Sequence, residues 1–396
     1  MEEATLKTTI EGELDELSKG IGDCFKTVKS REMARKYLLG LMGNAERKNG
    51  WQLAEQMGEE TPYKIQQFLY RGTWSADEVR DCLYVYVTDK LGDQEGVLVT
   101  DETGFLKQGK KSAGVKRQYS GTAGRIENCQ IGVFLTYASP KGYTILDREL
   151  YIPQEWAEDK ERRKAAGIPE KLTFRTKPAM ALEMIERADA AGIPYKWVTG
   201  DCVYGECYEL RQSLEANSKG YVMAVSGKAY VWMGFQQIRI SAVITALPED
   251  GWNRLNVGRG TKGERIYEWM IFDLNTPSDL PGQRKLLFRR SISKPDEICA
   301  YLCYSPENAS MEDLARIAAM RWTVEMCFAE TKGEVGLDHY EVRSYQGWYN
   351  HITMACLAHA LLTVLKTLPI FTEALSEILP EAPDDSLSAF KRGRGL

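Results

Sequence analysis

The chain has 396 residues, of which 43% are hydrophobic and 27% are charged. This length allows two or three domains with a substantial buried core, and the composition is that of an ordinary globular protein. The net charge of -5 argues mildly against a nucleic-acid partner, but such binding depends on local patches of charge rather than on the total.

The cysteine spacing argues against a thiolate metal site, and the apolar runs argue against a secreted or membrane-spanning protein. The nine cysteines form no CxxC pair, and only three histidines could join a thiolate metal site. The N-terminus lacks the pattern of a signal peptide, and the longest apolar run, Ile352 to Leu365, is too short to span a bilayer. We therefore expect a protein of a bacterial or archaeal cytoplasm, with reduced cysteines and no membrane partner.

The N-terminal part of the chain, residues 1–92, is predicted to be a helical domain. Apolar residues recur at three- and four-residue spacing over 31–41, 51–57, 62–71 and 75–91. The segment 51–69 is typical of a helix-turn-helix, with Lys64, Gln67 and Arg71 on its outward face. These side chains could contact DNA bases or phosphates, and a plain helical hairpin is the alternative.

From residue 93 the pattern changes to that of an α/β fold. The predicted strands are 97–100, 130–137, 143–151, 195–199 and 221–225, with helices over 178–191 and 206–216. Three meandering strands followed by helix, strand, helix and strand is the order of an RNase H-like mixed sheet flanked by helices.

The pattern of apolar and polar residues divides the chain from residue 93 onward into four parts. Residues 93–225 form the first part of the core, and 226–308 are a strand-rich insertion. Residues 309–370 form the second part of the core, with helices predicted over 311–332 and 348–368, and 371–396 are a polar C-terminal tail.

Three acidic residues are candidate metal ligands. Asp101 and Asp201 follow the first and fourth strands, which are neighbours in such a sheet. Glu325 shares one face of the helix 311–332 with Arg321 and Lys332. That stripe alone would favour a solvated face with ion pairs, but its coincidence with the two aspartates favours a site. Two Mg²⁺ ions about 4 Å apart, for which Mn²⁺ could substitute, would activate a nucleophile and stabilise the leaving oxygen of a phosphodiester.

Other titratable residues fit the site less well. Glu102 should point away from Asp101 if the strand continues, and Glu330 lies about 140° around the helix from Glu325. Asp147 lies in the middle of a strand and is expected to be structural, and His351 is expected to be a core histidine with satisfied hydrogen bonds.

A basic stretch follows the first catalytic strand. Residues 103–126 contain no acidic residue and carry six basic ones, which are Lys107, Lys110, Lys111, Lys116, Arg117 and Arg125. We expect this stretch to contact the DNA backbone, and a solvated loop is the alternative.

Several motifs together resemble the DDE transposases of bacterial insertion sequences, in the retroviral-integrase superfamily. They are Asp-Glu-Thr-Gly-Phe at 101–105, Gly-Asp-Cys-Val-Tyr-Gly at 200–205, and Arg-Trp-Thr-Val-Glu-Met-Cys-Phe-Ala-Glu-Thr-Lys at 321–332. The resemblance is to the branch with a Tyr-Arg-Glu-Lys signature on its catalytic helix and extends from about residue 45 onward. It implies that Asp101, Asp201 and Glu325 bind the metal ions and that Arg321 and Lys332 contact phosphates. The tyrosine of the signature would fall at Ala318.

The resemblance implies metal-dependent cleavage of transposon-end DNA, followed by transfer of the freed 3′-OH into target DNA. The partners would be both double-stranded DNAs and a second copy of the chain, at the nucleoid. The alternatives are an inactive or domesticated relative that only binds DNA, and a simple RNase H-like nuclease without strand transfer.

Overall fold

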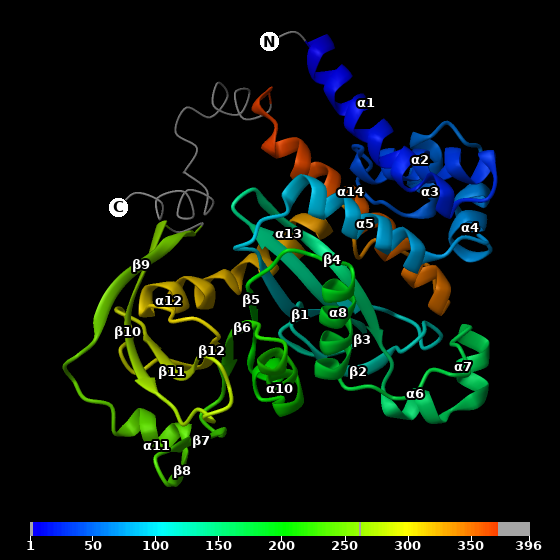
Figure 1. Cartoon of the computed structure of the whole chain (residues 1–396). Coiled ribbons are helices and arrows are strands. Elements are labelled where there is room, and N and C mark those ends of the chain that lie inside the picture. The colour runs from blue at the N-terminus through cyan, green and yellow to red at the C-terminus, as the bar shows by residue number, and fades with distance from the viewer. Residues whose placement is uncertain (1–2, 261–262, 371–396) are drawn as a thin grey trace.

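The computed structural model describes residues 3–260 and 263–370, so the predicted tail lies outside the described residues (Figure 1). The N-terminal part is helical, as predicted. Its helices are α1 (Glu3–Gly20), α2 (Val28–Met42), α3 (Gly50–Gln56), α4 (Tyr63–Tyr70) and α5 (Ala76–Leu91), with a 3-10 turn at Gly22–Cys24. None of the helices among the described residues combines the length and the apolar character that a membrane span requires.

Local capping fixes where these helices begin. Thr27 and Ser30 form a reciprocal capping box at the start of α2, and the Ser75 side chain accepts from the Glu78 N–H group at the start of α5. Leu53 and Ile65 are buried, so they lie on the inner face of the predicted helix-turn-helix segment.

The central sheet has the RNase H-like order. Its core strands are β1 (Val97–Leu106), β3 (Arg125–Ser139), β4 (Gly142–Tyr151), β5 (Trp197–Gly200) and β6 (Gly220–Val225). Strands β4, β3 and β1 form an antiparallel meander, and β5 and β6 continue from β1 in parallel. The predicted fold class is therefore confirmed.

Helices cover both faces of this sheet. On β1, the side chain of Glu102 contacts Lys177 and Tyr204, whereas its neighbour Asp101 contacts Arg321. Alternation along a strand therefore assigns two groups of helices to opposite faces. One group is α8 (Lys177–Ala190), α9 (Cys202–Gly205) and α10 (Tyr208–Ala216), and the other is α12 (Met311–Met320), α13 (Trp322–Val335) and α14 (Tyr345–Thr367). Two short helices, α6 (Gln154–Glu158) and α7 (Lys160–Ala166), follow β4.

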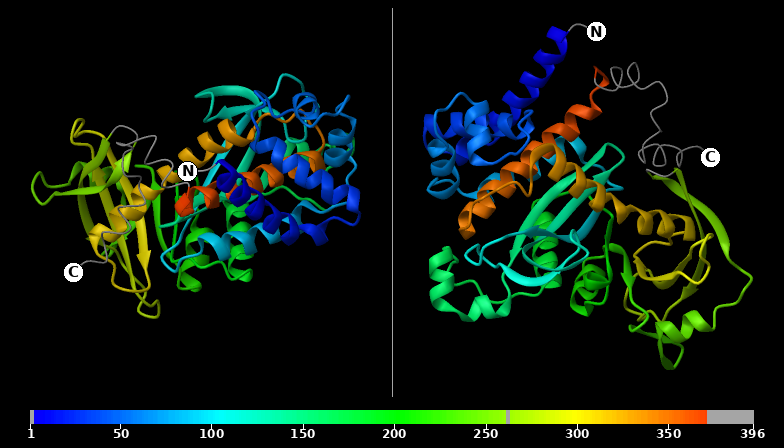
Figure 2. Two further views of the ribbon diagram at one scale, coloured as in Figure 1. Left: turned by 90° about the horizontal axis from the view of Figure 1, so that it is seen from above. Right: turned by 180° about the vertical axis from the view of Figure 1, so that it is seen from behind.

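The strand-rich insertion extends the main sheet. It contains β7 (Tyr230–Met233), β8 (Gln236–Arg239), α11 (Ile240–Thr245), β9 (Asn253–Gly260), β10 (Gly263–Asp273), β11 (Gln283–Arg290) and β12 (Ile298–Ser305). Strand β12 pairs antiparallel with β6, and β11, β10 and β9 follow in order. Figure 2 shows the insertion at one end of the molecule and the N-terminal helices at the other. The open edge of β6 thus gains hydrogen-bond partners from the inserted segment.

Helix α14 joins the N-terminal helices to the sheet. It packs against β4 and against α2, α4 and α5, and most of its side chains are buried. Asn350 donates to the Leu69 carbonyl group at 2.8 Å, and His351 Nδ1 lies 2.8 Å from the Tyr37 hydroxyl group. The N-terminal helices therefore share one hydrophobic core with the sheet.

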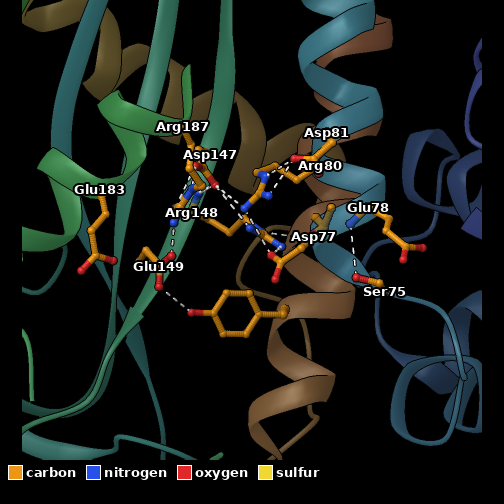
Figure 3. Close-up of polar contacts among 12 residues, drawn as sticks. Ser75, Asp77, Glu78, Arg80, Asp81, Asp147, Arg148, Glu149, Glu183 and Arg187 are labelled. Carbon is orange, nitrogen blue, oxygen red and sulfur yellow. Dashed lines mark hydrogen bonds and ion pairs between the residues drawn. The ribbon is translucent and has the colours of Figure 1, made fainter. Parts of the chain in front are cut away.

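A buried network of charges reinforces this junction (Figure 3). Asp147 and Arg148 on β4 are fully buried, and Arg148 pairs with Asp77 of α5 at 2.9 Å. Asp147 also accepts from Arg187 of α8 at 3.0 Å and from the Tyr84 hydroxyl group at 2.6 Å. The structural role predicted for Asp147 is therefore confirmed.

Several elements differ from the sequence-based predictions. Strand β1 continues to Leu106, because β3 pairs with its whole length. The basic stretch contains a short additional strand, β2 (Lys116–Ser120), which pairs with the start of β3. The helix predicted over 311–332 is interrupted at Arg321 and continues to Val335, where Gly336 ends it in the left-handed conformation.

Candidate active site

Asp101 and Asp201 leave neighbouring strands at the same level of the sheet. The parallel pairing of β1 with β5 ends at Thr100 and Gly200, and each aspartate is the next residue. Asp201 caps α9, where its side chain accepts from the Val203 N–H group at 2.9 Å. Asp101 lies within β1 rather than at its end, which corrects the prediction. Asp101 is nevertheless the first residue of β1 beyond its pairing with β5.

Arg321 connects the Glu325 side chain with Asp101. Glu325 lies in the first turn of α13, and Arg321 occupies the break between α12 and α13. The Arg321 guanidinium group lies 3.7 Å from an Asp101 carboxylate oxygen and 2.8 Å from a Glu325 carboxylate oxygen. The arginine therefore links an acid on the sheet to an acid on the helix.

The surroundings of the two aspartates disfavour the ionised form of each carboxyl group. Burial, and then the charge of Asp201, raises the pKa of Asp101 to about 7. Burial, and then the charge of Glu102, raises the pKa of Asp201 above its ordinary value. Carboxylates in this situation are stabilised by an added cation, and a divalent ion prefers oxygen ligands of this kind. The donor set therefore fits a divalent metal ion.

The three acids do not form a finished metal site in this structure. Among residues 3–260 and 263–370, no three histidine, cysteine, aspartate or glutamate side chains are grouped closely enough to hold a metal ion. Arg321 stands between Asp101 and Glu325 as a protein cation. Asp101 and Glu325 therefore both contact Arg321, and Asp201 follows the strand beside Asp101.

The competing residues have partners elsewhere. Glu102 accepts from the Tyr204 hydroxyl group at 2.6 Å and from Lys177 at 2.5 Å, so it points away from Asp101 as predicted. Glu330 is held by Tyr143, His359 and Lys366.

The remaining competitor is His351, for which the prediction of a core histidine is confirmed. Its ring contacts the Tyr37 hydroxyl group and the Gly336 carbonyl group, and burial lowers its pKa to about 4.

Two family models match the chain. A model described as a DDE superfamily endonuclease matches residues 21–243, which is more than half of the chain. The chain belongs to the DDE superfamily of endonucleases. A model described as a transposase DDE domain matches residues 176–361.

A curated relative points in the same direction. It is described as a probable transposase for insertion sequence element IS701 from Microchaete diplosiphon. It is 26% identical to this chain over 347 residues, which cover 84% of this chain and 82% of the relative. The predicted class, an insertion-sequence DDE transposase, is therefore confirmed, and membership in the superfamily implies the use of divalent metal ions.

Two lysines of the DDE endonuclease are turned toward its interior near the acids. Lys332 donates to the hydroxyl groups of Thr103 and Thr122 at 2.8 and 3.0 Å, and burial lowers its pKa. Lys107 lies 3.5 Å from the centre of the Tyr340 ring, and burial lowers its pKa to about 8. Lys107 therefore supports the packing around Tyr340 and would have to turn outward to reach DNA.

The other predicted basic residues of this DDE endonuclease lie near the surface. Lys110, Lys111, Arg117 and Arg125 are exposed, and half-buried Lys116 pairs with Glu155 at 2.6 Å. They belong to a loop and a hairpin that extend beyond Asp101, rather than to one long loop.

The predicted N-terminal DNA contacts line a groove of 620 Å³. Lys64, Gln67 and Arg71 from α4 form one part of it, and Lys64 pairs with Glu59 at 2.6 Å. The other part was not predicted from the sequence, and it consists of Lys26 and Lys29 around the start of α2 and Lys36 further along that helix. Their basic character was visible in the sequence, but their approach to α4 depends on how the helices pack.

Two residues close to Arg321 in the sequence, Ala318 and Trp322, differ in exposure. Ala318 is buried in the core, so a tyrosine at this position could not face DNA without repacking of α12. Trp322 is 40% exposed, and the guanidinium groups of Arg265 and Arg321 lie 5.7 and 5.6 Å from its ring. It is therefore a surface residue beside the acids.

Proposed function

We propose that this DDE endonuclease cuts the ends of its own transposon and joins each freed 3′-OH to target DNA. The observation that carries the proposal is the arrangement of Asp101 and Asp201 at equivalent positions of paired parallel strands, with Arg321 linking Asp101 to Glu325. Two phosphoryl-transfer steps of the same kind can use one such set of acids, and neither step needs a covalent bond between protein and DNA.

The proposed ligands are Asp101, Asp201 and Glu325, and the proposed cofactor is a pair of Mg²⁺ ions, for which Mn²⁺ could substitute. When bound, these ions would supply Lewis-acid stabilisation of charge on the reacting phosphodiester. The raised pKa values of the two aspartates support the assignment, because buried neighbouring carboxylates would be stabilised by a divalent cation.

Arg321 has a defined part in this scheme. In the structure it supplies the positive charge between Asp101 and Glu325. Metal ions at the acids would replace that charge and release the guanidinium group to a DNA phosphate, which it can hold through two hydrogen bonds. Lys332 would act beside it, once its hydrogen bonds to Thr103 and Thr122 give way to a phosphate.

We assign recognition of the transposon end to the groove between α2 and α4. Lys64 and Arg71 would bind phosphates, Gln67 would reach a base edge, and the added lysines Lys26 and Lys29 would extend the contact. The exposed residues Lys110, Lys111, Arg117 and Arg125, together with half-buried Lys116, would hold DNA beyond the cleaved bond. Because two ends must be joined at one target, we propose a homodimer on DNA, acting at the nucleoid of the cytoplasm.

The test uses DNA that carries the inverted repeats flanking the gene. Asp101→Asn should abolish Mg²⁺-dependent end cleavage while leaving end binding largely intact, and Asp201→Asn and Glu325→Gln should do the same. Glu334→Gln is the matched control, because Glu334 lies on α13 and is exposed. Normal cleavage by Asp101→Asn would show that the site is assigned wrongly.

The same system separates the alternatives. Wild-type protein that binds the ends and never cuts them would be an inactive relative. Protein that cuts but cannot join pre-cut ends to a target plasmid would be a nuclease without strand transfer.

A further inference from the structure

The hairpin formed by β2 and β3 is anchored beside the acids. Its tip carries Thr122, whose hydroxyl group lies 3.1 Å from the Thr103 hydroxyl group on β1. Lys332 of α13 donates to both hydroxyl groups. Thr103 is two residues beyond Asp101 on the same strand, so the hairpin is fixed to the strand that carries a catalytic acid.

The approach of the hairpin to β1 is close. A Cβ atom on Gly104 would lie 2.3 Å from the Ser120 hydroxyl oxygen, so only glycine allows this approach. Ser120 itself is completely buried. One side of the hairpin therefore packs against the protein and leaves the other side to solvent.

The free side presents an apolar pair. Tyr119 and Ile126 are direct cross-strand partners, and they are 66% and 58% exposed. Directly opposed side chains on paired strands lie about 5 Å apart, so the two form one continuous apolar surface. Two adjacent exposed apolar side chains are suited to contact with another molecule.

Exposed basic residues lie near this pair. Arg117 is on the same face of β2 as Tyr119. Arg125 is exposed at the start of β3 but opposes Ser120 on the other face, and the neighbouring loop adds Lys110 and Lys111. One acidic side chain, Glu127, stands close and pairs with Arg125 at 2.8 Å. Apolar side chains within a basic rim match nucleic acid, because phosphates bind the rim while bases or sugars cover the apolar centre.

We propose that the β2–β3 hairpin is a wedge that packs Tyr119 and Ile126 against DNA bases next to the reacting phosphodiester bond. The inference rests on the proposed function, because the acids define which bond reacts. The wedge would separate neighbouring bases and hold the strand away from the regular duplex. Arg117, on the same face of the hairpin as Tyr119, would bind a phosphate next to the opened step. Flexible or interrupted DNA should bind more tightly than intact duplex, since less stacking has to be broken.

The experiment measures binding in EDTA, so its outcome is independent of metal ligation and cleavage. The probes are a fluorescein-labelled 40-base-pair duplex and the same duplex with a central nick, followed by fluorescence anisotropy. A second nicked duplex carries 2-aminopurine beside the nick, which reports changes in base stacking. The variants are Tyr119→Ala, Tyr119→Phe and Ile126→Ser. Tyr208→Ala is the matched control, because Tyr208 is equally exposed on α10.

The proposal expects wild-type protein to prefer the nicked duplex and to change the 2-aminopurine signal. Tyr119→Ala should weaken nicked-duplex binding about fivefold or more, as loss of a stacked aromatic ring does. Tyr119→Phe and Tyr208→Ala should bind as wild type does. Unchanged nick preference in both Tyr119→Ala and Ile126→Ser would overturn the proposal. Conversion of a DNA-free dimer to a monomer by Tyr119→Ala, with nick preference intact, would also overturn it and assign this face to contact between copies.

Discussion

Replacement of Arg148 by methionine should strongly destabilise the junction between the N-terminal helices and the sheet. Arg148 is 1% exposed and makes three polar contacts, to Asp77 at 2.9 Å, to Asp147 at 3.3 Å and to Thr353 at 2.8 Å. Removing one partner of a buried ion pair costs about 3–5 kcal/mol, because the remaining charge stays buried.

The structure places the expected cost near the lower limit of that range. Asp147 keeps hydrogen bonds from Tyr84 and Arg187, and methionine preserves much of the packing volume. We therefore expect Arg148→Met to lower the free energy of unfolding by about 3 kcal/mol. The double variant Arg148→Met with Asp147→Asn should lose less than the sum of the two single losses, because the two buried charges interact with each other.

Urea unfolding followed by tryptophan fluorescence measures these changes. The control is Asp81→Asn, which removes an acid that is 62% exposed and should cost less than about 1 kcal/mol. Equal stability of Arg148→Met and wild type would refute the reasoning. So would a double variant whose loss equals the sum of the single losses, because that result would mean that the two charges are not coupled.

Three further predictions follow from single residues. Burial raises the pKa of Glu330, but hydrogen bonds from His359 and Tyr143 outweigh it and lower the pKa to about 2. The folded pKa is thus below the ordinary value near 4.5, so this stabilisation is complete above that value and is lost as pH falls toward 2. Urea midpoints between pH 3 and pH 7 should therefore fall less steeply with acid in Glu330→Gln than in wild type, and parallel curves would contradict the assignment. Gly336→Ala should lower the free energy of unfolding by about 1–2 kcal/mol, because φ is +65° at this residue. Gly333→Ala should raise the free energy of unfolding by about 0.5–1 kcal/mol in the same assay, because Gly333 lies within a helix and an added Cβ atom would meet no other atom. Lys64→Ala should weaken binding to the transposon end and make the slope of log K against log salt concentration about one less steep. Fluorescence anisotropy at several salt concentrations measures this slope, and an unchanged slope would exclude a phosphate contact.

The sequence alone was sufficient for the order of the core and for the position of the acids along it. The spacing of apolar residues within a segment shows whether it is a helix or a strand and which of its faces is buried. This information is present in the segment itself. Asp101 and Asp201 could be placed together because paired parallel strands bring equivalent positions to one level of a sheet.

Side-chain partners from distant segments could not be predicted in this way. Thr103 and Lys332 are 229 residues apart in the sequence, yet they share a hydrogen bond. The inward turn of Lys107 depends on Tyr340, and the length of β1 beyond Asp101 depends on its pairing with β3. A basic residue has the same local pattern whether it faces DNA or an aromatic ring, so only packing distinguishes the two.

The sequence by itself therefore determined an RNase H-like core with acids at two neighbouring strands and one helix. Only the tertiary structure decided that Arg321 stands between Asp101 and Glu325, that the insertion continues the sheet from β6, and that a hairpin exposes an apolar pair beside the acids. The physical reason is that periodic burial is a property of each segment, whereas charge pairing and edge pairing are properties of segments that meet only after folding.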